Sequence, residues 1–276
     1  MSIGYATQKG LTNSNPMRRW SQQVSYTTPP TPAGNNRRTG TAANLTSLTF
    51  SASNGAAVTN SIYEFGGGSL DLYSNGRTIE YYGYNTSNTG AGTAPGGFPT
   101  GTGDFCIEGW FYKPSGRSSA TGEVGGVDTG GGLMIRFGSG YNVGGINNIA
   151  LFARGAADLD YAPYTWTADT WTHWAAQRKS GTVSFWANGN KLTKLGSGGG
   201  TYNFASSSNT TIVWGSYDPA TGDEDLDGYL DELCVSNSWR YDDTQSTYNV
   251  PTSPFTVDQY TCMLFHFDSN LATAAT

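Results

Sequence analysis

The stretch TWTHWAAQRKSGTVSFWANGNKL, residues 170–192, shows the fold most clearly. Thr172–Arg178 and Thr182–Ala187 are short alternating runs rich in aromatic and β-branched residues, which is typical of β-strands. Asn188-Gly189 follows the second run, and both residues tolerate the positive φ angles that a two-residue hairpin turn requires. The stretch therefore predicts antiparallel strands.

Runs of the same kind recur from Tyr63 to the end of the chain, bounded by Gly, Asn and Asp. Eight more are clear: Ser69–Tyr73, Arg77–Tyr84, Asp104–Lys113, Leu133–Phe137, Asn148–Ala153, Thr210–Trp214, Gly228–Ser236 and Thr261–Phe267. Many short strands without intervening helices indicate an antiparallel sandwich or jelly roll, and the lack of an internal repeat disfavours a propeller or solenoid. We therefore predict an all-β, two-sheet antiparallel jelly-roll sandwich.

The composition excludes several classes of protein. Charged residues make up 13% of the 276 positions, against about 25% in an average chain, and 38 residues are Gly, which argues against a helical protein. Hydrophobic residues make up 37%, enough for the core of one domain and too many for a disordered chain. No run approaches the roughly 18 apolar residues of a membrane span, and residues 1–10 lack a signal-peptide pattern, so we expect no membrane partner.

The three cysteines, Cys106, Cys234 and Cys262, exclude a disulfide scaffold because an odd number cannot pair fully within one chain. No CxxC or paired-His spacing suggests zinc. We expect these cysteines to be small hydrophobic residues in strand interiors.

Charge divides the chain into two parts. The first 63 residues carry five basic and no acidic residues, a charge of +5, whereas the remaining ten basic and 21 acidic residues give −11. Residues 1–62 are rich in Ser, Thr, Asn, Gly and Pro and have no hydrophobic period, so they cannot fold alone. We predict an extended anchoring arm over residues 1–62, which docks on an acidic protein surface through Arg18, Arg19, Arg37 and Arg38, followed by a jelly-roll domain over residues 63–276. Five basic residues scattered over this region are too few to form a nucleic-acid-binding surface, so we do not expect nucleic acid as a partner.

Five segments stand in order along the predicted domain: FGGGSLDLY (65–73), GTGDFCIEGWFY (101–112), TWTHWAAQRKSGTVSFWANG (170–189), DGYLDELCVSNSWRYD (227–242) and VPTSPFTVDQYTCMLFHFDS (250–269). Together they resemble the laminin-G-like branch of the concanavalin A-like lectin/glucanase superfamily, and the last two segments are similar to a version frequent in bacteriophage structural proteins. The resemblance implies a two-sheet jelly roll, often with a binding role, but does not by itself supply an activity.

Polysaccharide hydrolysis is one possible activity, because the superfamily includes glucanases. Their Glu-x-Asp-x-x-Glu strand places two carboxylates in one cleft, as a retaining mechanism requires. The nearest run here, Glu224-Asp225-Leu226-Asp227-Gly228, ends on Gly and lacks the last Glu, and no GxSxG supports a Ser–His–Asp triad. We therefore expect no enzyme activity.

An acidic loop is the candidate metal site. Asp223-x-Asp225-x-Asp227-Gly228 matches the first half of a calcium loop, although its twelfth position is Cys234. Asp231 would add an oxygen ligand, as nearby carboxylates do in calcium-dependent members of the superfamily. Two interpretations remain: a calcium site, or a solvated acidic turn before a strand.

Asp231 also has a structural interpretation. Strand alternation places it on the side of Tyr229, Leu233 and Val235, where an acidic side chain needs a hydrogen-bond partner. His173 is likewise interpreted as a half-buried structural histidine, because nothing in its surroundings marks it as a ligand or a base.

Loop aromatics are the candidate carbohydrate-binding groups, since sugar rings stack on Trp and Tyr. Tyr164, Trp166, Trp214 and Tyr217 lie in or beside predicted connecting segments, whereas Trp110, Trp171 and Trp186 lie within predicted strands and are expected in the core. The alternative for the loop aromatics is packing against the rim of the sandwich.

The residues and the resemblance together favour a non-enzymatic structural protein of a bacteriophage virion, a capsid decoration or a tail or head fibre. Its expected partners are capsid or tail proteins and further copies of itself in a homo-oligomer. A lectin module for host-surface glycans is the alternative, and a polysaccharide hydrolase is the least favoured.

Overall fold

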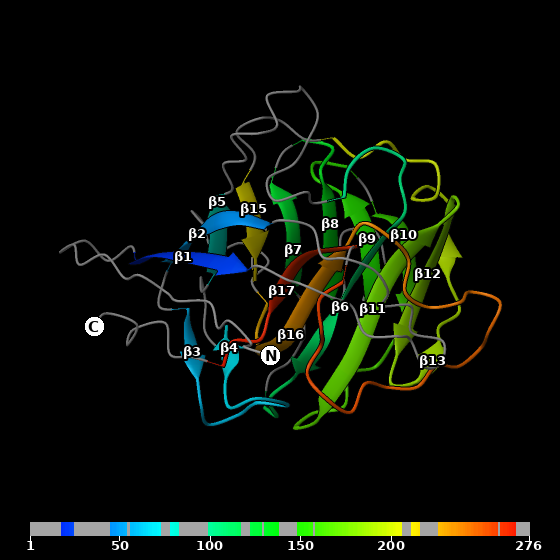
Figure 1. Ribbon diagram of the computed structural model, residues 1–276. Helices are drawn as coiled ribbons and strands as arrows, with labels where there is room; N and C mark the ends of the chain where they lie inside the picture. Colours follow the sequence, from blue (N-terminus) through cyan, green and yellow to red (C-terminus); the bar gives the residue numbers. More distant parts are fainter. Residues whose placement is uncertain are drawn as a thin grey trace.

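The computed structural model describes residues 18–24, 45–53, 56–72, 78–82, 99–116, 122–128, 130–137, 148–156, 158–205, 211–215, 226–258 and 260–268. These residues form two antiparallel β-sheets that pack face to face, with no helix among them, so the fold is an all-β jelly-roll sandwich (Figure 1). No helix in the described part of the chain is long and apolar enough to span a membrane.

One sheet has nine strands. In chain order they are β1 (Arg18–Val24), β2 (Leu45–Ser53), β5 (Thr78–Tyr82), β7 (Gly122–Asp128), β8 (Leu133–Phe137), β9 (Asn148–Ala153), β10 (Asp158–Pro163), β14 (Leu195–Gly196) and β15 (Thr211–Trp214). Their order across the sheet is β1-β2-β5-β15-β7-β8-β9-β10-β14.

The other sheet has eight strands. They are β3 (Ala57–Thr59), β4 (Ser69–Asp71), β6 (Phe105–Tyr112), β11 (Trp171–Lys179), β12 (Thr182–Ala187), β13 (Asn190–Lys191), β16 (Tyr229–Ser236) and β17 (Thr261–Phe265). The order across the sheet is β13-β12-β11-β6-β16-β4-β3. Strand β4 pairs with the first part of β16, and β17 pairs with the part of β16 that follows.

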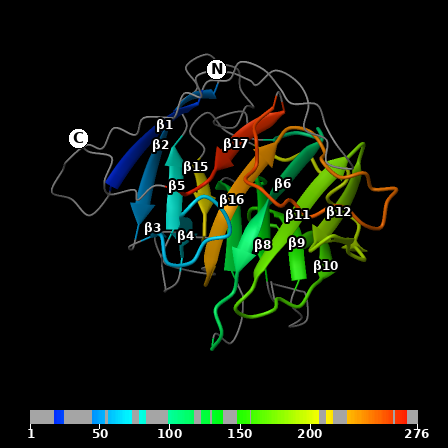
Figure 2. The same cartoon turned by 60° about the horizontal axis from the view of Figure 1, so that its bottom comes forward.

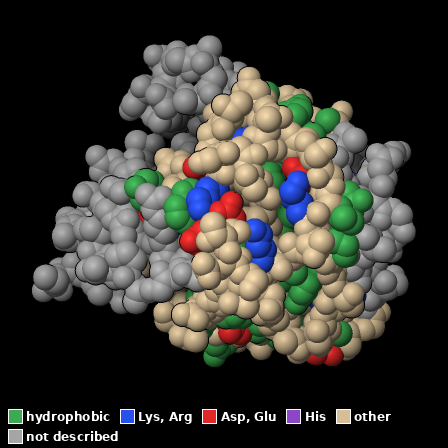
Figure 3. Space-filling view, turned by 90° about the vertical axis from the view of Figure 1, so that its right-hand side faces the viewer, with side chains coloured by type: hydrophobic (Ala, Val, Ile, Leu, Met, Phe, Trp, Pro, Cys, Tyr) green, Lys and Arg blue, Asp and Glu red, His purple; other side chains and the backbone are tan. Residues whose placement is uncertain are grey.

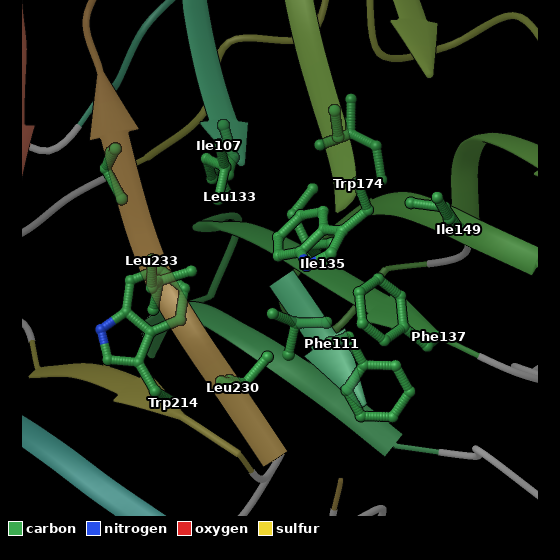
Figure 4. Packing of buried hydrophobic residues seen from close by; sticks show 14 of the residues in the cluster. Ile107, Phe111, Leu133, Ile135, Phe137, Ile149, Trp174, Trp214, Leu230 and Leu233 are labelled. Carbon is green, nitrogen blue, oxygen red and sulfur yellow. The ribbon is translucent and has the colours of Figure 1, made fainter. Parts of the chain in front are cut away.

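Aromatic and aliphatic side chains from the inner faces of both sheets form the core (Figure 4). Phe137 of β8 packs against Phe111 and Trp174 of the opposite sheet, with ring centroids 5.1 and 5.0 Å apart. Trp214 of β15 lies beside Leu233 of β16. Apolar burial of this extent is the main force that holds the two sheets together.

Arg178 of β11 closes one end of the sandwich. Its guanidinium is buried and donates hydrogen bonds of 2.8–3.1 Å to four backbone carbonyls, those of Gly101, Gly103, Gly199 and Tyr202. One cation thereby joins two loops, residues 101–103 and residues 199–202, through their backbone carbonyls.

Residues 237–258 cover most of the outer face of the eight-stranded sheet and are coloured orange in Figure 1. Tyr241 and Tyr248 pack against Trp186 of β12, with ring centroids 5.6 and 5.7 Å away. The segment is anchored by Arg240, which forms a buried pair with Asp258.

Figure 3 shows the side of the molecule on which β12 and β13 lie, and Lys and Arg side chains lie beside Asp and Glu side chains there. Lys179 bonds Asp242 at 3.2 Å and Asp243 at 2.8 Å and lies 4.3 Å from the ring centre of Trp239. These mixed charges join β11 to the covering segment.

The structure confirms the ten strands predicted from the sequence, and the Asn188-Gly189 turn has φ angles of 40° and 84°. It also contains β7 and β10, which were not predicted. The β7 sequence GEVGGVD resembles a turn, but its glycines permit close approach: a Cβ at Gly125 would lie 2.1 Å from the carbonyl oxygen of Val213. The three cysteines are free and buried in strands, as expected.

Three strands within residues 1–62 belong to the sheets: β1 and β2 to the nine-stranded sheet and β3 to the eight-stranded sheet. Strand β2 pairs with β1 and with β5, and β3 pairs with β4 of the other sheet. Composition misses these strands because their hydrogen-bond partners lie elsewhere in the chain. Arg18 and Arg19 belong to β1, whereas Arg37 and Arg38 lie outside the described residues.

Candidate functional site

Three aromatic residues lie in register at one end of the eight-stranded sheet. Trp171 begins β11 and pairs with Tyr112 at the end of β6, which pairs with Tyr229 at the start of β16. Residues that pair across neighbouring strands point to the same face of a sheet. Because the adjacent Phe111 and Leu230 point into the core, the side chains of all three aromatic residues project from the outer face. All three are partly exposed. Figure 2, which brings the bottom of Figure 1 forward, shows these strands side by side. We call Trp171, Tyr112 and Tyr229 the aromatic row.

The rings of the aromatic row touch one another but are not coplanar. The centroids of Tyr112 and Trp171 are 5.5 Å apart with planes inclined by 60°, and those of Tyr112 and Tyr229 are 5.9 Å apart with planes inclined by 76°. Such tilted contacts are favourable between aromatic rings and hold Tyr112 between its neighbours.

The adjacent outer-face row is buried. It consists of His173, Trp110 and Asp231, in register across the same three strands. Phe65 packs edge-on against Trp110 at 5.6 Å, and Phe255 packs against His173 at 5.9 Å. Trp171 packs against the cluster that contains Trp110 and Phe255, and the three rings of the aromatic row remain partly exposed.

Two carboxyl groups lie beside the aromatic row. Asp71 of β4 pairs with Tyr229, and Asp169 precedes β11. The carboxylate of Asp169 accepts hydrogen bonds from the Ser115 backbone N–H at 2.8 Å and from the Tyr112 hydroxyl at 3.4 Å. The bonds from Ser115 lower the pKa of Asp169, so it is ionised at neutral pH. Burial and the charge of Asp169 raise the pKa of Tyr112, which stays a neutral hydrogen-bond donor.

This arrangement suits recognition of polyhydroxylated ligands. Exposed aromatic rings pack against the C–H faces of sugar rings, and the neighbouring carboxylates and phenols exchange hydrogen bonds with hydroxyl groups. The row comes from three strands held in fixed register, so its spacing is set before any ligand arrives.

Asp231 and Glu232 hold neighbouring chain segments against β16 at an irregularity in this strand. The pairing with β6 shifts between Asp231 and Cys234, and Glu232 has a φ of 50°. Asp231 accepts the backbone N–H groups of Glu64, Phe65 and Glu232 at 2.8–3.0 Å. Burial nevertheless raises its pKa to about 7, because desolvation outweighs these bonds.

Glu232 is also buried and binds two further chain segments. One of its oxygens accepts the Phe255 N–H at 2.6 Å and the other bonds His266 Nδ1 at 2.7 Å. Burial by itself lowers the pKa of His266, but the bond to Glu232 and the nearby charges raise it overall. The acidic pair thus attaches three chain segments to β16.

These contacts correct two expectations about Asp231. The irregularity reverses the strand phase, so Leu230, Leu233 and Val235 face the core while Asp231 faces outward. Its oxygens are engaged by amides and do not fit a calcium site. The structural interpretation of Asp231 is confirmed, and Glu232 shares that role.

The remaining calcium candidates are not brought together in the described residues. Asp227 is half-buried immediately before β16, and Asp223 and Asp225 lie outside those residues. Among the described side chains, no group of three or more His, Cys, Asp or Glu could hold a metal ion. Calcium binding by the acidic loop stays a prediction.

Of the two interpretations of the loop aromatics, packing against the sandwich holds for the three that the structure describes, and they do not form a sugar-stacking surface. Trp166 is 4% exposed and Trp214 is 1% exposed, and both belong to the core. Tyr164 is half-buried and packs edge-on against Trp166 at 4.9 Å. Tyr217 lies outside the described residues. Loop aromatics next to a sandwich are drawn into its core because burial of a large apolar ring is favourable.

His173 is fully buried in a polar network, which confirms its structural interpretation. Its Nδ1 lies 2.5 Å from the Tyr248 hydroxyl, and its Nε2 lies 3.7 Å from Glu108. The Tyr241 hydroxyl donates to Glu108 at 2.5 Å, and burial raises the pKa of Tyr241 well above its ordinary value. The network ties the covering segment to β6 and β11.

Sequence reasoning missed the aromatic row. Trp171 was expected in the core, and Tyr112 and Tyr229 were not considered as binding residues. The usable signal was that each aromatic stands at the first or last position of its strand, where covering elements often end. Nothing local, however, shows that the three strand ends are neighbours.

The chain is similar to several solved structures. A heptameric pentraxin from Limulus polyphemus is 15% identical over 61% of this chain and 78% of its own, with a TM-score of 0.39. A putative carbohydrate binding protein from Bacteroides ovatus is 14% identical over 94% of this chain and 62% of its own, with a TM-score of 0.47. The search of curated protein sequences returns no relative.

Tailspike protein 2 from Escherichia coli O157:H7 bacteriophage CAB120 is 11% identical over 85% of this chain, with a TM-score of 0.50. This chain spans 31% of the tailspike, so the likeness concerns one part of that protein and its fold alone. The family profile described as the concanavalin A-like lectin/glucanases superfamily matches residues 83–244, more than half of the chain. The protein therefore belongs to the concanavalin A-like lectin/glucanases superfamily.

Proposed function

We propose that this protein is a non-enzymatic, carbohydrate-binding jelly roll carried on a bacteriophage particle. The observation that supports sugar binding is the aromatic row, in which Trp171, Tyr112 and Tyr229 stand accessible and in register beside Asp71 and Asp169. A superfamily named for lectins adds support, because the same sandwich hosts sugar-binding sites in other chains.

The absence of catalysis is part of the proposal. Three buried carboxylates have structural partners: Glu108 accepts a hydrogen bond from Tyr241, Glu123 pairs with Arg136 at 2.8 Å, and Glu232 binds His266. A retaining or inverting glycosidase needs two carboxyl groups facing one accessible glycosidic bond.

The particle location rests on the resemblance of residues 227–242 and 250–269 to bacteriophage structural proteins and on the basic N-terminal region. We propose that residues 1–62 anchor the subunit, through Arg18, Arg19, Arg37 and Arg38, to a capsid or tail protein or to a neighbouring copy in a homo-oligomer. Replacing these four arginines by Ala is expected to stop incorporation into particles without changing the melting temperature of the free protein. Normal incorporation would contradict the anchoring role.

A glycan array with the full-length chain tests sugar binding directly. The wild type is expected to bind a set of glycans, and Tyr112→Ala to lose about ten-fold or more in affinity because the central ring is removed. Tyr161→Ala, a partly exposed Tyr in β10 of the other sheet, is the matched control and should bind normally. Absence of binding to every glycan would refute the lectin role and leave a purely structural display protein. Release of reducing sugars from a bound glycan would refute the absence of catalysis.

A further inference from the structure

The geometry of the aromatic row points to a narrower ligand class, and this inference rests on the proposed function. We infer that the row binds a soluble, neutral oligosaccharide lengthwise across β11, β6 and β16, with about three sugar units in contact. The flat surface of a crystalline polysaccharide and anionic sugars are excluded from this class.

The length follows from the register. Trp171, Tyr112 and Tyr229 occupy one row on three adjacent strands, and their centroids are 5.5 and 5.9 Å apart. Neighbouring strands are about 4.8 Å apart, comparable to the length of one sugar ring with its linkage. One ring is therefore available to each successive sugar, and a fourth sugar passes beyond the aromatic row.

The preference for a soluble chain follows from ring orientation. A crystalline polysaccharide presents a flat face and needs coplanar rings. In the aromatic row, however, the planes of successive rings are inclined by 60° and 76°. A flexible oligosaccharide can turn each sugar to follow its own ring.

The preference for neutral sugars follows from charge. The ionised Asp169 lies beside the central Tyr112, and Asp71 is paired with Tyr229 at one end of the row. Carboxylates accept hydrogen bonds from sugar hydroxyls but repel a uronate carboxylate nearby.

Titration calorimetry of the full-length protein tests this inference with malto-, cello- and xylo-oligosaccharides of one to six units. For the series that binds, affinity is expected to rise with length up to about three units and then to stay constant. Trigalacturonic acid, as the anionic probe, is expected to bind at least ten-fold more weakly than the neutral trisaccharide. Sedimentation with crystalline cellulose should leave the protein in the supernatant.

Two variants connect these results to the row. Asp169→Asn retains an acceptor for the Ser115 N–H and is expected to reduce the discrimination against trigalacturonic acid, whereas Tyr161→Ala should change nothing. A plateau at one sugar, equal affinity for the anionic probe, or sedimentation with cellulose would overturn the inference while leaving sugar binding intact. Binding unaffected by Tyr112→Ala would move the site elsewhere and overturn both, as would the absence of binding to any sugar.

Discussion

Arg240 is the residue whose loss should most damage the covering segment that borders the aromatic row. Its Nη1 and Nη2 donate to the two carboxylate oxygens of Asp258 at 2.5 and 2.8 Å, and its Nε and Nη2 donate to Ser236 Oγ at 2.9 and 2.7 Å. Arg240 is fully buried, and Asp258 is 1% exposed. Removing one partner of such a pair leaves an uncompensated buried charge, which costs about 3–5 kcal/mol.

We therefore predict that Arg240→Ala lowers the free energy of unfolding by about 3–5 kcal/mol, which corresponds to a melting temperature lower by roughly 6–20 °C for a domain of this size. Urea and thermal unfolding followed by circular dichroism at pH 7 measure both quantities. Burial by itself raises the pKa of Asp258, but Arg240 lowers it overall, so the stabilisation is present above the unfolded pKa of about 3.9 and is lost as the pH falls through the folded value.

The double variant Arg240→Met with Asp258→Leu separates a buried pair from two independent contacts. Replacing both charges by apolar side chains removes the uncompensated charge, so it should cost less than Arg240→Ala alone. If the costs of the single variants simply add, or if Arg240→Ala costs less than about 1 kcal/mol, the reasoning from buried-pair energetics is refuted.

The raised pKa of His266 beside Glu232 means that its stabilisation is complete below the unfolded pKa of about 6.5 and is lost as the pH rises through the folded value. The melting temperature should therefore fall between pH 6 and 8, and less steeply in His266→Gln; an unchanged slope would contradict this. If the acidic loop binds calcium, millimolar calcium should raise the melting temperature of the wild type but not of Asp225→Ala. Equal melting temperatures with calcium and with chelator would identify a solvated acidic turn. In limited trypsin digestion, Arg37 should be cut early, because its surroundings are Gly- and Pro-rich, and Arg18 should be protected by the pairing of β1 with β2. Rapid cutting at Arg18 would show that β1 does not pair in the isolated chain.

The strands that the sequence predicts are those whose pattern is local. Thr182–Ala187 ends at an Asn-Gly turn, and the turn appears as predicted. Strand β7 was missed, because its glycines serve close packing against β15 and resemble a turn when taken without that partner. Strand β2 was missed for a related reason: its partners, β1 and β5, are distant in sequence.

The candidate site was far less predictable than the fold. Trp166 and Trp214 stand in or beside connecting segments, and the sequence left both exposure and packing against the sandwich open, whereas the structure buries both rings in the core. Asp231 was expected to face the side of Leu233, but the irregularity at Glu232 turns it outward. A shift of one residue reverses every side chain that follows in a strand, and no sequence pattern marks where it occurs.

Sequence alone determined the all-β class, most of the strands, the hairpin turn and the superfamily resemblance, because alternation and turn chemistry act between residues close together in the chain. Tertiary structure alone decided which outer-face side chains are buried and which remain accessible. Residues 237–258 help to bury His173 and Trp110, whereas Trp171 and Tyr112 remain partly exposed. Register then places Tyr229 beside Tyr112, although 116 residues separate them. Pairing and coverage depend on contacts between distant segments, and those contacts exist only once the two sheets have formed.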